Sequence, residues 1–113
     1  MTQERFIQGL NDQTNTFQET MDFIEANFTF NAVSFKVGNQ VNEAGTNQGS
    51  CKIFCLGKTL SLNEEQTLQC FGDFYRKDVV EHPEADDHQN IRNFIEFGWS
   101  GVEIDASALI QKS

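Results

Sequence analysis

The spacing of apolar residues changes abruptly near residue 28, and this change constrains the fold more than any other feature of the chain. From Phe17 to Phe28, large apolar residues recur at steps of four, three and four, the period of one face of a helix. The stretches 28–30 and 33–37 then alternate apolar with polar residues and are rich in aromatic and β-branched types, which favours strands. The chain must therefore combine helices with short strands.

Periodicity and end signals predict the remaining elements. Helices are expected over 3–10, 15–27 and 62–80, together with a helix that Asp86 caps and Gly98 ends, and a last strand is expected over 102–105. The stretch 39–50 is rich in Asn, Gln and Gly and predicts a loop. Residues 51–60 alternate like a strand, but Ser50 could cap a helix there, and we favour the helix.

These elements predict an α+β fold, a mostly helical single domain over residues 1–113 with a few short strands. The length suits one domain, and the sequence has no repeat or linker. We expect one core built from the apolar faces of the helices, formed by Phe17, Met21, Ile24, Phe71, Phe94 and Ile95.

Charge excludes two classes of partner. Eight Lys and Arg against 17 Asp and Glu give a net charge of −9, so binding to nucleic acid or to an anionic membrane is not expected. No stretch is long and apolar enough to span a membrane, and the first ten residues lack the pattern of a secretory signal. We therefore expect a cytoplasmic protein with its three cysteines reduced.

A first group of candidate site residues surrounds Cys51. With Lys52 beside it and a helix starting nearby, Cys51 could be a nucleophile, with His88 as its base and Asn90 orienting the imidazole. The competing interpretation, which we favour, is a small buried side chain. Asn42, Asn47 and Ser50 precede Cys51 and complete the group. The cysteine spacing matches no strong zinc signature, so neither a metal nor a cofactor is expected.

A second group follows in the C-terminal half of the chain. It contains Tyr75, Arg76, His88, Asn90, Arg92 and Trp99. The two arginines could hold an anion or a carboxylate in a polar pocket, or they could pair with neighbouring acids in a structural network, which we favour. We expect the two groups to meet in space, with Arg76, His88 and Asn47 close together.

Three segments carry a family resemblance: Asn42 to Phe54, Thr67 to Val79, and Asp87 to Phe94 with Gly-Trp-Ser-Gly at 98–101. With these segments in order and at unbroken spacing, the chain resembles the HopJ type III effector family of small bacterial proteins from Phe17 to Leu109. Asn31 departs from the Thr-Pro expected there. The resemblance implies delivery into a host cell by a type III apparatus, and it implies no catalytic residues.

The sequence therefore predicts a small acidic binding or interaction protein. Its partner would be an unknown protein or a small anionic ligand, and we expect a monomer. The alternative is a small enzyme, a hydrolase or transferase, with a polar pocket containing Cys51, Lys52, His88 and Arg92.

Overall fold

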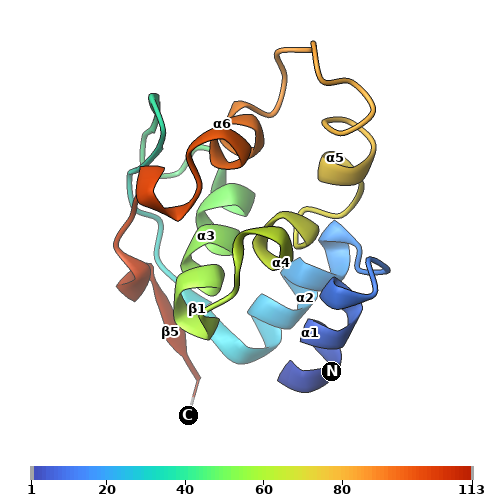
Figure 1. Cartoon of the computed structure of the whole chain (residues 1–113). Helices are drawn as coiled ribbons and strands as arrows, with labels where there is room; N and C mark the ends of the chain where they lie inside the picture. Colours follow the sequence, from blue (N-terminus) through green and yellow to red (C-terminus); the bar gives the residue numbers. More distant parts are fainter. Residues whose placement is uncertain (1, 113) are drawn as a thin grey trace.

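The computed structural model describes residues 2–112 and has the predicted α+β architecture, with helices making up most of its regular structure. The helices are α1 (Gln3–Asn11), α2 (Phe17–Asn27), α3 (Gln48–Leu60), α4 (Glu64–Gln69), α5 (Asp73–Arg76) and α6 (Gln89–Phe97), with 3₁₀ turns η1 (Trp99–Gly101) and η2 (Ala106–Ala108). The strands are β1 (Phe28–Phe30), β2 (Phe35–Val37), β3 (Gln40–Asn42), β4 (Val102–Glu103) and β5 (Leu109–Gln111). Figure 1 shows their arrangement.

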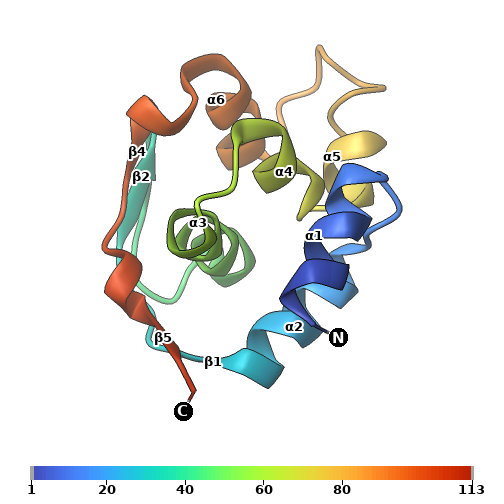
Figure 2. The ribbon, with the colours of Figure 1, turned by 60° about the horizontal axis from the view of Figure 1, so that its bottom comes forward.

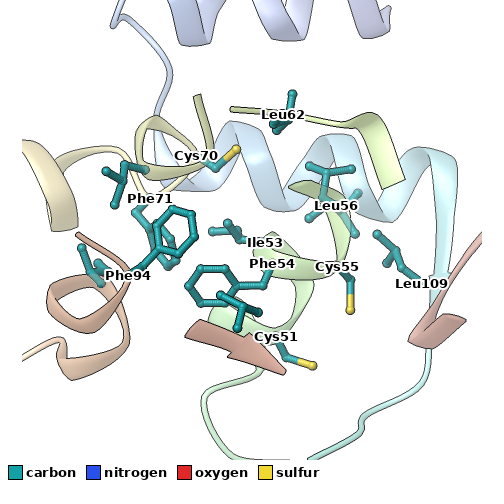
Figure 3. Close-up of a cluster of buried hydrophobic side chains, with 14 of the residues drawn as sticks. Cys51, Ile53, Phe54, Cys55, Leu56, Leu62, Cys70, Phe71, Phe94 and Leu109 are labelled. Atoms are coloured by element: carbon teal, nitrogen blue, oxygen red, sulfur yellow. The ribbon is translucent and has the colours of Figure 1, made fainter. Parts of the chain in front are cut away.

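Helix α3 forms the centre of the molecule. Its residues from Cys51 to Gly57 are all buried except Lys52, so the helix is apolar on nearly every side, as expected of a helix inside a core. Figure 2 shows α3 end-on, with helices on one side and strands on the other. In the core, the Phe54 ring packs against Phe71 and Phe94, with ring centroids 5.8 and 5.2 Å away (Figure 3). The helix predicted for 51–60 is therefore present and begins earlier, at Gln48.

Two small antiparallel sheets cover the remaining side of α3. Strands β3, β2 and β4 form one sheet in that order, and β1 pairs with β5 in the other. Strands β3 and β5 were not predicted. The first lies inside the expected loop 39–50, and the second pairs with β1 from the far end of the chain. Strand β3 lies in a segment rich in Asn, Gln and Gly, and β5 depends on its pairing with β1, which local spacing does not reveal.

The single helix predicted over 62–80 is wrong. The chain forms α4 and α5 instead, and the two are separated at Gly72, whose φ is +61°. A Cβ atom at Gly72 would lie 2.6 Å from the backbone nitrogen of Phe17, so the start of α2 approaches too closely for any side chain there. Residues 77–88 then form a loop that runs from α5 to α6 at one end of the molecule (Figure 1).

The predicted core is correct in part. Ile24, Phe71 and Phe94 are buried, Phe17 and Met21 are partly buried, and Ile95 is 50 % exposed. Helix α6 buries its other face, including Asn90 and Asn93, so apolar spacing alone misplaced Ile95. The predicted cap Asp86 is also wrong, because α6 begins after His88. Likewise Ser50 is not the cap of α3, which begins after Asn47.

Candidate functional site

A cleft of about 300 Å³ opens where α3 and α6 begin. Four of the predicted candidates line it: Asn47 and Ser50 at the start of α3, and His88 and Asn90 at the start of α6. The other lining residues are Phe17, Gln40, Gly49, Phe71, Phe74, Gln89 and Ile91. The structure thus brings together Asn47 and His88, which are 41 residues apart in the sequence, as the sequence predicted for these two residues.

Helices α3 and α6 begin at the cleft with the same unusual backbone conformation. Their N-cap residues, Asn47 and His88, have left-handed backbones with φ of 49° and 50°. Neither side chain caps its helix, so the first backbone N–H groups receive no acceptor from the cap. Because helix N-termini carry partial positive charge and no Asp or Glu is among the lining residues, this cleft offers hydrogen-bond donors and no carboxylate.

Asn42 connects the starts of α3 and α6 through side-chain hydrogen bonds. It is 2 % exposed and does not line the cleft. Its Nδ2 donates to Asn90 Oδ1 at 2.9 Å, and its Oδ1 accepts from Asn90 Nδ2 at 3.0 Å. The same Oδ1 accepts from Asn47 Nδ2 at 2.7 Å. Asn42 is therefore a positioning residue that fixes one residue from each side of the cleft.

His88 is held at the edge of the cleft by an acid and an aromatic ring. Its Nε2 lies 3.1 Å from Asp78 Oδ2 and 3.8 Å from Asp87 Oδ2. Its ring centroid is 5.2 Å from that of Phe74. These contacts attach the 77–88 loop to the start of α6 and orient the imidazole.

Arg76 and Arg92 lie outside the cleft, and their hydrogen bonds connect separate segments of the chain. Arg92 donates to Asp87 Oδ1 at 2.6 Å and to the backbone carbonyls of Asp78, His82 and Asp87, which closes the 77–88 loop. Its hydrogen bond lowers the pKa of the Asp87 carboxyl. Arg76 donates to Gln69 Oε1 at 2.6 Å and to the carbonyl of Asn15.

These geometries match the structural interpretation of the arginines. Arg76 does not join Asn47 and His88 in the cleft. Tyr75 and Arg92 instead line a separate groove on another part of the surface.

Cys51 also lies outside the cleft. It is 2 % exposed, and its thiol donates to the carbonyl of Val33 at 3.8 Å. A hydrogen bond from Cys55 lowers the pKa of Cys51 to about 7, and the hydrogen bond with Cys51 and burial raise that of Cys55. Figure 3 shows both sulfur atoms pointing away from Phe71 and Phe94. No hydrogen bond joins Cys51 to His88 in the described part of the chain, and of the two only His88 lines the cleft, so a Cys-His pair is not assembled.

The last two candidates have structural surroundings. The Lys52 ammonium lies 5.2 Å from the centre of the Phe30 ring. Trp99 Nε1 donates to the carbonyl of Leu62 at 3.1 Å, and its ring packs edge-on against Phe54 and Phe94. Both side chains therefore hold elements together.

Sequence reasoning missed several cleft residues. Gln40 and Gln89 supply amides, and Phe74 supplies one wall. Gln89 belongs to a segment that carries the family resemblance, whereas the helix predicted over 62–80 does not place Phe74 at a site. Among residues 2–112, no three His, Cys, Asp or Glu side chains are grouped to hold a metal. None of the described helices is long and apolar enough to cross a membrane.

Comparison with known proteins gives a consistent result. The model of the HopJ type III effector protein family matches residues 3–109, nearly the whole chain. No curated protein matches. A crystal structure of a protein of unknown function, VPA0580, is 46% identical, covers 99% of this chain and 95% of its own, and superposes with a TM-score of 0.94. The chain therefore belongs to the HopJ type III effector protein family.

Proposed function

We propose that the protein is a small binding module whose cleft at the starts of α3 and α6 takes a small anionic ligand. The observation that carries this proposal is the arrangement of Asn47, Ser50, His88 and Asn90 around one cleft that no carboxylate lines. Family membership supports an effector-like role for such a module.

Electrostatics favours an anion in this cleft. Each helix N-terminus carries roughly half a positive charge, and two of them meet here. The protein has 17 acidic residues, yet none lines the cleft; Asp78 contacts His88 Nε2 at 3.1 Å, and Asp87 is paired with Arg92. An anion would therefore meet donors from both helices and the amides around them.

The aromatic walls narrow the class of ligand further. Phe17, Phe71 and Phe74 line the cleft beside the polar groups, and Phe74 is 39 % exposed. Gly49 leaves room for the Phe17 ring, whose Cζ atom would lie 2.8 Å from a Cβ atom at that position. A small carboxylate with an apolar body matches both halves of this lining.

The geometry favours binding over catalysis. Cys51 is buried away from the cleft, so the thiol is not available to a ligand there. Ser50 and His88 both line the cleft, but no hydrogen bond joins them in the described part of the chain, so no base activates the hydroxyl. The residues present can bind and orient an anion without transforming it.

The proposal is tested by calorimetric titration with benzoate, its neutral analogue benzamide and inorganic phosphate. We expect benzoate to bind. Benzamide lacks the negative charge and phosphate lacks the apolar body, so both should bind more weakly. Ser50→Glu places a carboxylate in the cleft and should abolish binding. Glu is also favourable in the first turn of a helix, so the melting temperature should be retained.

Ser34→Glu is the matched control, because Ser34 is exposed, lies outside the cleft and receives the same charge. It should bind benzoate like the unmodified protein. Equal binding of benzamide and benzoate, no heat with any of the three compounds, or full binding by Ser50→Glu would contradict the proposal.

A further inference from the structure

A second surface feature, distinct from the cleft, is a groove of about 360 Å³ between the 77–88 loop and α6. Its lining is mostly apolar and consists of Tyr75, Val79, Val80, Pro83, Arg92 and Ile95. It shares none of these residues with the cleft.

Two of the most exposed apolar side chains of the protein lie in this one groove. Val80 is 54 % exposed and Ile95 is 50 % exposed, and they come from the two elements that form the groove. Single exposed apolar residues are ordinary on a protein surface, but a pair that lines one concavity marks a contact site. Burying both against a partner would remove substantial apolar surface from water.

One carboxylate lies directly at the groove, and further acidic residues are frequent in the segments that form it. Glu81, Glu84 and Glu96 each directly follow a lining residue in the sequence, and Glu65 accepts a hydrogen bond from the Tyr75 hydroxyl at 3.2 Å. None of these four carboxylates forms an ion pair within residues 2–112.

The one cation in the groove does not offset this charge. Arg92 lies in its lining, but its guanidinium is paired with Asp87, and its side chain is only 13 % exposed. The groove therefore combines a mostly apolar lining with neighbouring carboxylates that form no ion pair within residues 2–112.

We infer that this groove docks a basic amphipathic segment of another protein, whose apolar side chains enter between Val80 and Ile95 and whose Lys or Arg side chains meet the Glu65 carboxylate and the other acidic residues of the neighbouring segments. Charge complementarity selects this occupant. A second copy of the chain would bring the same carboxylates and a net charge of −9, and an anionic lipid surface would be repelled in the same way.

The probe is a fluorescein-labelled amphipathic helical peptide made of leucine, alanine and lysine, followed by fluorescence anisotropy. Two further peptides separate the two contributions: one has alanine in place of every leucine, and the other has glutamate in place of every lysine. The first peptide should bind, the alanine peptide should bind much more weakly, and the glutamate peptide should not bind.

The test variant is Val80→Ser with Ile95→Ser, which removes the apolar walls and leaves the charge unchanged. We expect it to weaken binding roughly tenfold or more. Val41→Ser with Ile110→Ser is the matched control, since these residues are 65 % and 53 % exposed and lie outside the groove, and it should bind normally. All of these residues are exposed, so folding should be retained.

Three results would overturn the inference: equal binding of the leucine and alanine peptides, equal loss in both double variants, or no binding at all. A dimer in sedimentation that Val80→Ser with Ile95→Ser dissociates would assign the groove to a second copy instead. Ser50→Glu should leave peptide binding intact, so this test stands apart from that of the cleft.

Discussion

Replacing Asn42 by Ala should destabilise the protein because it leaves the buried side chain of Asn90 without its hydrogen-bond partner. Asn90 is 6 % exposed and would lose both hydrogen bonds that it shares with Asn42. A buried polar group without a partner costs about 1–3 kcal/mol. Asn47 is exposed, so water can replace its lost bond. The two groups that lose a partner are Asn90 Oδ1 and Nδ2. Because Asn90 lines the open cleft, we expect the free energy of unfolding to fall by about 2 kcal/mol, the lower end of the range for two such groups.

Urea denaturation followed by the fluorescence of Trp99, the single tryptophan, measures this loss. A destabilisation of that size should lower the melting temperature by roughly 10 °C in a domain of this length. The double variant Asn42→Ala with Asn90→Ala should be much less destabilised than the sum of the two single variants, because the second change removes the stranded amide. Asn31→Ala, at an exposed position, is the control.

A stability of Asn42→Ala within about 0.5 kcal/mol of the unmodified protein would refute the reasoning, since that is the range of ordinary surface substitutions. Strict additivity in the double variant would show that the two amides do not act as a unit. Either result would show that Asn42 does not position both sides of the cleft.

Three further predictions concern the core, the thiols and the 77–88 loop. Phe71→Ala should cost about 3–5 kcal/mol in urea denaturation, whereas Ile95→Ala, at an exposed site, should change stability by less than about 0.5 kcal/mol; similar costs would contradict the assigned burial. The three buried cysteines should react with a thiol reagent only after unfolding, and rapid reaction of the folded protein would contradict their burial. Because Arg92 lowers the pKa of Asp87, their pairing stabilises the fold above about pH 4, the ordinary range of an aspartate, and is lost as the pH falls through the lower folded value. Melting temperatures should therefore fall more steeply as the pH is lowered below about 4 in the unmodified protein than in Asp87→Asn, and parallel profiles would show that the pair contributes nothing.

The helical periods and the fold class were predictable because they depend on local spacing. The α2 pattern and the end of α6 at Gly98 are local signals, and both are present in the structure. The break at Gly72 was not predictable, since it arises from the approach of Phe17, which lies far away in the sequence. Pairing of β1 with β5 is equally non-local, because it joins the two halves of the chain.

The candidate site was predictable in its polar residues but not in its boundaries. Asn47, Ser50, His88 and Asn90 were recognised, and the structure places them together. Arg76 and Arg92 are candidates for binding an anion because arginine is rare in this acidic chain. In the structure, each donates mainly to nearby carbonyls and acids. Sequence spacing cannot distinguish an arginine that ties two segments from one that faces a ligand, because both need the same residue types nearby.

If the starts of α3 and α6 form one anion site, amide NMR detects this most directly. Titration of ¹⁵N-labelled protein with benzoate should shift the backbone amides of residues 48–51 and 89–91 together, with one shared saturation curve. Benzamide should leave them nearly unchanged. Shifts confined to one helix, two different saturation curves, or shifts only at residues distant from the cleft would contradict a single anion site.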